Sequence, residues 1–294
     1  MKTLRVGSRD SKLAVMQTEL VLEQIHKRHP EVNIELVTLK TTGDLILDKT
    51  LDKIGGKGLF VKELDAALLE GRIDLSVSSL KDLPMEESPE LPVVCYAKRG
   101  DARDALVLPE NTLHQPVGQN IGSSSARRQL QLKALFPDAA VSSVRGNIVT
   151  RLAKLDRGEY SALILASAGL KRAGLAHRIS RIFSPEEMLP AAGQGTLAVQ
   201  ARADFDVSFF DGIHDVPTMY TALAERAFVR ALNGGCSSPI AAYAAVQGQE
   251  MKLTGLHYSE ASGRHVVRSI VGDVRQAELL GEQLAVLCKK ELEE

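Results

Sequence analysis

Aromatic side chains are scarce in this chain. Its 294 residues include no tryptophan, and aromatic residues make up only 4%. Proteins that hold single-stranded nucleic acid stack its bases on aromatic side chains. The formal net charge is −1 at pH 7, which provides no overall attraction for nucleic acid. We therefore expect no nucleic-acid partner.

Cysteine and long apolar runs are also lacking. The three cysteines, Cys95, Cys236 and Cys288, form neither a CxxC motif nor a cysteine–histidine metal pattern. No apolar run approaches the about 18 residues that span a bilayer, and the first one is too short for a secretion signal. We expect a reduced, cytoplasmic location, no bound metal and no membrane partner.

Short strand and helix patterns alternate along most of the chain. Strand patterns lie at 4–8, 34–38, 73–77, 119–123, 140–144 and 161–166, and helix patterns lie at 11–27, 60–70, 126–135, 147–155 and 168–175. This alternation is typical of α/β layering around largely parallel sheets, and the length suggests two or three domains. The charged stretch 98–101 is a candidate boundary between the two halves.

The last part of the chain has a different pattern. A helix pattern at 219–232 is followed by strand patterns at 240–246, 252–258 and 265–271, and a helix pattern at 276–292 closes the chain. Strands in series with flanking helices predict a small α+β domain.

Two serine-rich segments, 6–11 and 121–125, each lie between a predicted strand and a predicted helix. The unpaired N–H groups and the dipole of a helix N-terminus attract anions. The alternative is plain capping of the two helices by serine, which is common. The pair of segments together with nearby arginines keeps both interpretations open.

Positive charge is concentrated between residues 123 and 172, where nine cations stand against three acids. The prominent arginines are Arg127, Arg128 and Arg145, which sit beside predicted strand or helix ends. Guanidinium groups pair with carboxylates through two hydrogen bonds, so a small ligand with several carboxylates is one interpretation. A solvated charged surface is the other.

Two further positions suit chemistry. Lys81 and Asp82 follow a predicted strand, and catalytic groups of α/β proteins collect at the carboxyl ends of strands. Asp82 could move protons or offset positive charge there, or it could simply be a turn residue before Pro84. Cys236 lies in a Gly-Gly-Cys turn, which suits a nucleophile or a covalent tether, whereas Cys95 and Cys288 fit the pattern of inert core thiols.

The segment 43–58 is rich in glycine and charge, which predicts a loop that can close over a site. It contains lysine beside glycine, but the GxxxxGK[ST] phosphate-binding motif is absent. A nucleotide site is therefore a weak interpretation of this loop.

Taken together, these segments resemble the porphobilinogen deaminase family. The resemblance runs nearly end to end and is carried by residues 7–14, 55–63, 79–84, 122–129, 144–147, 150–152, 165–172, 193–195 and 234–236. It implies two lobes like those of periplasmic binding proteins, with mixed, largely parallel sheets, and a small α+β C-terminal domain. The implied limits are 1–97 with 195–214 for domain 1, 101–192 for domain 2 and 216–294 for domain 3. The return of the chain to domain 1 follows from the resemblance alone.

The resemblance also implies the reaction. Family members carry a dipyrromethane cofactor on a cysteine through a thioether, and Cys236 is the matching position. Each porphobilinogen loses ammonia and is coupled to the growing polypyrrole chain. Four couplings precede release of hydroxymethylbilane by water, in tetrapyrrole (haem) biosynthesis. A monomer is implied as well.

Residue roles follow from the same resemblance. Asp82 is the implied catalytic residue and also binds the cofactor. The other implied cofactor-binding residues are Ser79, Lys81, Ser123, Ser125, Arg127, Arg128 and Gly146. The implied substrate-binding residues are Arg9, Ser11, Gln17, Arg145, Arg151 and Arg172, with Lys53 and Lys57 on the loop over the cleft.

Several positions depart from the family pattern. Ser78 stands where histidine is common, Ala126 where leucine is usual, and Ser123 where threonine is common. Ser237 and Ser238 follow Cys236, where the second residue is usually valine. None of these changes removes Asp82, Cys236 or the arginines. The competing interpretation is a module that binds a small anion without chemistry, but that module would have no use for Cys236.

Overall fold

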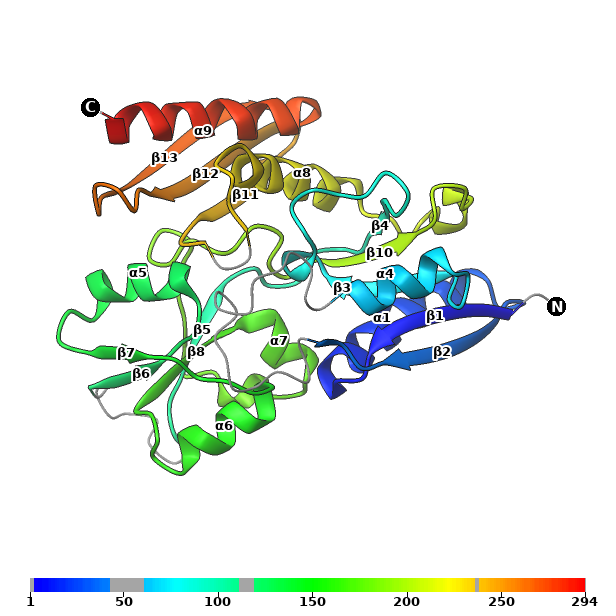
Figure 1. Cartoon of the computed structure of the whole chain (residues 1–294), viewed down its shortest axis with the longest axis horizontal. Coiled ribbons are helices and arrows are strands. Elements are labelled where there is room, and N and C mark those ends of the chain that lie inside the picture. The colour runs from blue at the N-terminus through cyan, green and yellow to red at the C-terminus, as the bar shows by residue number, and fades with distance from the viewer. Residues whose placement is uncertain (1–2, 43–60, 111–118, 236–237, 294) are drawn as a thin grey trace.

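The computed structural model describes residues 3–42, 61–110, 119–235 and 238–293. Its strands form two five-stranded sheets and one three-stranded sheet. Figure 1 shows the three-stranded sheet, with its two long helices, above the two five-stranded sheets. We call the two five-stranded sheets with their helices the first and second lobes, and the remainder the third unit.

The first lobe is a mixed sheet with strand order β2, β1, β3, β10, β4. Its strands are β1 (Thr3–Arg9), β2 (Asn33–Leu39), β3 (Leu75–Ser79), β4 (Val93–Tyr96) and β10 (Leu197–Ala201), and its helices are α1 (Lys12–Arg28) and α4 (Lys62–Leu69). β1 pairs in parallel with β2 and β3, whereas β10 runs antiparallel to both of its neighbours. Val21 and Ile25 of α1 pack with Val6 on one face of the sheet, and Leu64 of α4 packs with Val37 on the other.

The second lobe repeats this plan with strand order β7, β6, β8, β5, β9. Its strands are β5 (Asp104–Val107), β6 (Asn120–Gly122), β7 (Ala140–Ser142), β8 (Ala162–Ala166) and β9 (Arg181–Ile182), and its helices are α5 (Ala126–Leu135), α6 (Ile148–Asp156) and α7 (Ser167–Arg172). β6 is parallel to both neighbours, and β5 is antiparallel to both of its own. The repetition explains why similar serine-rich turns recur in the sequence.

The chain passes from the first lobe to the second and back again. Val199, at the centre of β10, faces Val77 of β3 and Cys95 of β4. The two crossing segments are bonded to each other, since Gly100 N donates to Gly195 O at 3.1 Å. The return strand that the resemblance implied is therefore present, although the domain limits stay a prediction.

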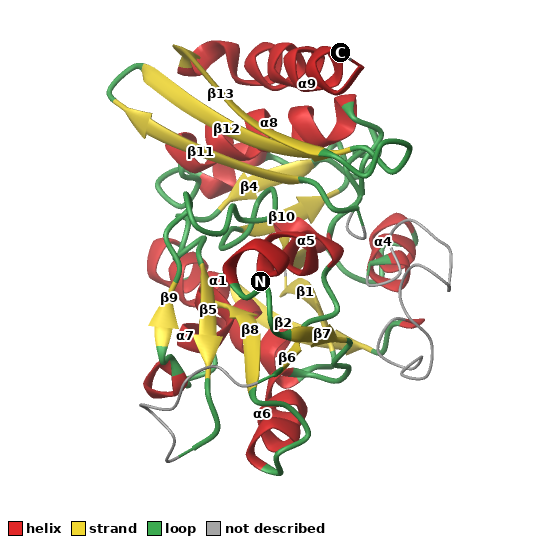
Figure 2. Ribbon diagram, turned by 90° about the vertical axis from the view of Figure 1, so that its left-hand side faces the viewer, coloured by secondary structure: helices red, strands yellow, loops and turns green. Residues whose placement is uncertain are grey.

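The third unit is an antiparallel sheet of β11 (Ala241–Gln247), β12 (Glu250–Tyr258) and β13 (His265–Asp273), with helices α8 (Val216–Ala231) and α9 (Ala277–Glu293). Phe228 of α8 and Leu284 of α9 pack against Leu253 in one buried cluster. Figure 2 shows the two helices on one side of these strands.

The predicted α/β class with a small α+β unit is confirmed by these sheets. α5 has the predicted limits, and Gly71, with φ of +66°, ends α4 as expected. α8 begins three residues earlier than predicted, because Asp215 caps it by accepting from Thr218 N at 2.9 Å. Within the described ranges, no helix is both long and apolar enough to cross a membrane.

Candidate active site

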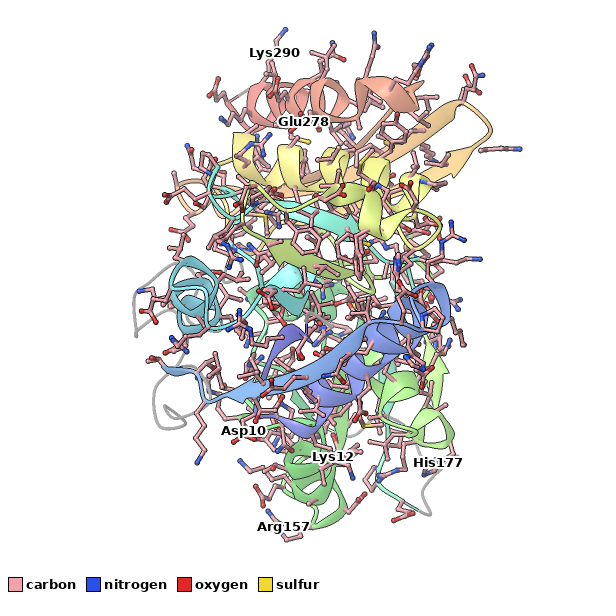
Figure 3. All side chains as sticks on the ribbon, turned by 90° about the vertical axis from the view of Figure 1, so that its right-hand side faces the viewer. Asp10, Lys12, Arg157, His177, Glu278 and Lys290 are labelled. Atoms are coloured by element: carbon pink, nitrogen blue, oxygen red, sulfur yellow. The ribbon has the colours of Figure 1, made fainter. Side chains whose placement is uncertain are left out.

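A cavity of about 630 Å³ lies between the two lobes, a volume typical of small-ligand sites. It is lined by the ends of β1 and β3 and by α1 from the first lobe, and by α5, α6, α7 and the segment before α6 from the second. Figure 3 labels Asp10, at the end of β1, on the side of the molecule away from Glu278 and Lys290 of α9. The third unit's last helix is therefore remote from this lining.

Positive charge dominates the described lining. The cations are Arg9, Lys40, Lys81, Arg128, Arg145, Arg151 and Arg172, and the carboxylates are Asp10 and Asp82. A ligand with several carboxylates would neutralise this excess. The second interpretation of the basic segment, a solvated surface, does not fit the four arginines of the second lobe that line the cavity.

The sequence analysis named most of this lining. The predicted site residues found there are Arg9, Ser11, Gln17, Ser79, Lys81, Asp82, Arg128, Arg145, Gly146, Arg151 and Arg172. These residues come from segments up to about 160 positions apart in the chain. Their roles towards a ligand stay predictions, but their convergence on one cavity is a structural fact.

Asp82 lies on a 3₁₀ turn, Leu80–Asp82, directly after β3. Leu80 is fully buried, its N–H donates to Thr196 O at 3.0 Å, and its carbonyl accepts from Leu83 N at 3.1 Å. These contacts fix the backbone on both sides of the turn, so the Asp82 side chain is presented to the cavity from a fixed backbone.

Gln17 and Ser79 support the same edge of the cavity. Ser79 Oγ donates to Gln17 Oε1 at 3.2 Å, which joins α1 to the end of β3. Ser11 caps α1 by accepting from Ala14 N at 3.3 Å and also lines the cavity. The capping and the anion-binding interpretations are thus compatible at Ser11.

A buried carboxylate, Asp104, organises the opposite edge. Its Oδ1 accepts from Arg128 Nη2 at 2.7 Å, and its Oδ2 accepts from Arg127 Nη1 at 2.7 Å. Burial alone would raise the pKa of Asp104, but the charges of Arg127 and Arg128 hold it well below its usual range. Asp104 therefore stays ionised and orients Arg128 at the cavity wall.

Gln194 connects this ion cluster to Lys81. Its Nε2 donates to Asp104 Oδ1 at 2.9 Å and to Ala102 O at 2.7 Å, and its Oε1 accepts from Lys81 Nζ at 3.3 Å. Burial is the main cause that lowers the pKa of Lys81 to about 8; the charge of Arg128 acts in the same direction, and the charges of Asp82 and Asp104 oppose it. An added anionic group near Lys81 would favour its charged form.

The second lobe supplies three more guanidinium groups. Arg151 Nε donates to Gly146 O at 2.8 Å, and burial, together with Arg128 and Arg145, lowers its pKa to about 10. Burial also lowers the pKa of Arg172 to about 10, and its Nη2 donates to Gly195 O at 2.5 Å on the crossing segment. Gly146 has φ of +109°, and a Cβ there would lie 2.8 Å from a Thr150 methyl, so a side chain does not fit at this position.

Three predicted cofactor contacts do not line the cavity. Ser125 caps α5, Ser123 is 1% exposed, and Arg127 donates to Asp104 and to Leu189 O at 2.8 Å. Arg127 is buried, and its Nη1 donates to one carboxylate and one carbonyl of the protein itself. Lys53, Lys57 and Cys236 lie outside the described residues.

Sequence reasoning missed Asp104, Gln194 and Lys40. Lys40 directly follows β2, and the rule that ligand groups collect at carboxyl ends of strands could have identified it. Asp104 opens an apolar run, and a charged residue at that position could have suggested a buried partner. Within the described part of the chain, no group of three or more His, Cys, Asp or Glu is placed to hold a metal ion.

The fold and the cavity define a two-lobed α/β protein with a basic ligand cavity between its lobes. A family model described as the porphobilinogen deaminase dipyromethane cofactor binding domain matches residues 4–208, and a model of the porphobilinogen deaminase C-terminal domain matches residues 219–290. The chain belongs to the porphobilinogen deaminase family.

Curated relatives agree over nearly the whole length. Porphobilinogen deaminase of Acetivibrio thermocellus is 54% identical over 283 residues, 96% of this chain and 97% of the relative. That of Ruminiclostridium josui is 54% identical, with 97% of each chain covered, and that of Bordetella parapertussis is 44% identical, with 97% and 92% covered.

Solved structures resemble the chain only distantly. The periplasmic aliphatic sulphonate binding protein SsuA of Escherichia coli is 17% identical with a TM-score of 0.42, covering 79% of this chain and 75% of that one. The effector binding domain of a BenM variant is 16% identical with a TM-score of 0.43, covering 76% and 95%.

Proposed function

We propose that this chain builds a linear tetrapyrrole from porphobilinogen in the cavity between its lobes, with Asp82 as the catalytic carboxylate. The observation that carries this proposal is the position of Asp82 in a cavity whose charged groups are otherwise mostly cations. Membership of the family supports the reaction itself.

The cavity suits a dipyrromethane held through its carboxylates. When bound, this group supplies the free pyrrole α-carbon to which the first substrate is joined. We propose that Cys236 anchors it by a thioether and that Lys81 and Arg128 bind its acetate and propionate groups. The cations would gain partners that offset the cost of their burial.

Asp82 has two tasks in this scheme. Porphobilinogen loses ammonia when its aminomethyl C–N bond breaks, and the positive charge that develops is shared with the pyrrole nitrogen. The Asp82 carboxylate would accept a hydrogen bond from that pyrrole N–H and offset the charge. After the new C–C bond forms, the same carboxylate would accept the proton that leaves the pyrrole α-carbon.

The arginines would position the substrate. Each porphobilinogen brings an acetate and a propionate, so the ligand gains negative charge with every one of the four couplings. Arg9 from the first lobe and Arg145, Arg151 and Arg172 from the second would pair with these groups. A single water ends the sequence when hydroxymethylbilane leaves and the dipyrromethane remains behind.

We also propose that the enzyme works as a monomer in the cytoplasm. Cys95 and Cys288 are free and buried, and burial raises the pKa of these thiols to about 12 and about 11. Inert thiols of this kind suit a reducing compartment. Light scattering on the purified protein would test the monomer.

The proposal is tested by mass and by product. Intact-mass measurement on the wild-type protein should exceed the sequence mass by one dipyrromethane, and porphobilinogen should yield ammonia and hydroxymethylbilane in the ratio set by four couplings. The Cys236→Ala protein should have the bare sequence mass and no turnover. Cys95→Ala and Cys288→Ala are matched controls that should keep both the adduct and the activity. An active Cys236→Ala protein without the adduct would overturn the proposal.

A further inference from the structure

Arg226 is a buried cation on α8 of the third unit, outside the cavity lining. Only 2% of its surface is exposed. A buried guanidinium is costly unless hydrogen-bond acceptors surround it. The acceptors that surround the Arg226 guanidinium therefore show which segment of the chain this residue holds in place.

The acceptors are backbone carbonyls of the loop that carries Asp82. Arg226 Nη2 donates to Pro84 O at 2.5 Å and to Met85 O at 3.3 Å, and Nη1 donates to Leu80 O at 3.4 Å. Leu80 immediately precedes Lys81 and Asp82, and Pro84 lies two residues after Asp82. One guanidinium thus contacts the backbone on both sides of Lys81 and Asp82; we call the Leu80–Asp82 turn the catalytic turn.

Among the described residues, Glu87 is a carboxylate partner of Arg226, but a weaker one. Glu87 Oε1 lies 3.5 Å from Arg226 Nη2, and its side chain is 32% exposed. Solvent screens an ion pair at this position. Among the contacts described here for the guanidinium, the three carbonyls in or beside the Leu80–Asp82 turn are therefore the strongest.

The helix that carries Arg226 is itself fixed. The preceding residue, Glu225, is fully buried and accepts from both Nη atoms of Arg99, at 2.6 and 3.1 Å. It also accepts from Gly193 N at 2.7 Å and from Ala244 N at 2.8 Å. Through Glu225, the two crossing segments and β11 hold α8 next to Arg226. The backbone of Arg226 is therefore fixed relative to the turn that it contacts.

We propose that Arg226 is a positioning residue for Asp82, which fixes the Leu80–Asp82 turn so that the carboxylate meets the pyrrole nitrogen at the correct distance. The inference rests on the proposed role of Asp82. A guanidinium is required because a planar fork serves several acceptors at once, whereas the lysine ammonium is a point charge on a flexible stem. Displacing a catalytic group by about 1 Å can cost about a hundredfold in rate.

The test compares Arg226→Met and Arg226→Lys with Arg230→Met, a matched control on the same helix. Arg230 is partly exposed, and its side chain pairs with Glu278 of α9 at 3.0 Å. Steady-state turnover is measured per cofactor-bearing molecule, which intact mass counts. This normalisation removes any loss of folded or assembled protein.

We expect kcat to fall by about tenfold to a hundredfold in Arg226→Met and by less in Arg226→Lys, with KM for porphobilinogen within about twofold of wild type. Arg230→Met should match wild type in both constants. If Arg226 had a purely structural role, its replacement would lower the melting temperature and leave the normalised kcat unchanged. An unchanged normalised kcat in Arg226→Lys would therefore overturn the inference, even if Arg226→Met does not fold. Asp82→Asn, measured in parallel, separates the two proposals, because full turnover in that variant would overturn the role of Asp82 instead.

Discussion

Asp104 binds Arg127 and Arg128 through different oxygens, each at 2.7 Å. All three side chains are buried, and the guanidinium groups also donate to the carbonyls of Leu189 and Ile164. One carboxylate therefore compensates two buried cations. Arg128 lines the cavity, and Arg127 does not.

Removal of this carboxylate should be costly for stability. In Asp104→Ala both guanidinium groups lose their charged partner, and breaking a buried pair costs about 3–5 kcal/mol. Asp104→Asn keeps the shape and some hydrogen bonds and should lose less. Urea unfolding of the three proteins measures the difference, and a loss below about 1 kcal/mol in the alanine variant would contradict this account.

Arg127 and Arg128 should differ in their effect on binding. Arg128 lines the cavity, whereas Arg127 is buried outside the lining and bound to Asp104. Both methionine variants should lose stability, but only Arg128→Met should lower the fraction of molecules whose intact mass includes the dipyrromethane, because only Arg128 is placed to donate charge-assisted hydrogen bonds to the cofactor's carboxylates. An equal loss of the dipyrromethane in Arg127→Met would instead support the cofactor contact that the family resemblance implies for Arg127.

Lys81 should produce an alkaline limit of activity. Burial lowers the pKa of its ammonium to about 8, so the charge that attracts carboxylates is present below that pH and is lost above it. Because the carboxylates of the bound dipyrromethane favour the charged form of Lys81, we expect kcat/KM of the cofactor-bearing enzyme to fall at a pH above about 8. Lys81→Arg, which stays charged, should remove this limb from the pH profile; the same limb in both proteins would assign it to another group.

The charged form of Asp65 on α4 should lower the free energy of unfolding of this protein. Burial raises the pKa of its carboxyl to about 6, and its Oδ1 has no hydrogen-bond partner in the described structure. Above pH 6 the folded protein bears the cost of a poorly solvated charge, whereas below the ordinary value near 4 the group is neutral in both states. Asp65→Asn should therefore raise the melting temperature at pH 8 by about 2 °C and have no effect at pH 4.

A lower melting temperature of Asp65→Asn at pH 8 would show instead that the folded protein stabilises the charged form of Asp65. Asp204→Asn is a suitable control, because Asp204 is highly exposed and lies 3.9 Å from Arg202. An exposed pair of this kind contributes little to stability. The control should leave the melting temperature unchanged at both pH values.

Local patterns predicted the elements that carry the site. Alternation at Ile73, Leu75 and Val77 predicted the strand that leads to Lys81 and Asp82, and Ser11 and Ser125 predicted the starts of two helices. These features depend on neighbours within a few residues, so a single sequence records them.

Long-range pairings were beyond such reasoning. Asp104 meets Gln194 at a separation of 90 residues, and Arg226 meets Pro84 at a separation of 142. β10 returns to the first sheet, but its short apolar sequence does not show which strands it pairs with. The resemblance supplied that return, but it did not supply the roles of Asp104 and Arg226, which only the assembled structure brings beside the site.

The central claim is that Asp82 carries the chemistry while the basic cavity holds the ligand. The most direct measurement is turnover of Asp82→Asn, with its intact mass recorded on the same sample. We predict a mass that includes the dipyrromethane and a kcat lower by about a hundredfold or more, as expected on loss of a general base. A cofactor-bearing Asp82→Asn protein that makes hydroxymethylbilane at the wild-type rate would contradict the claim.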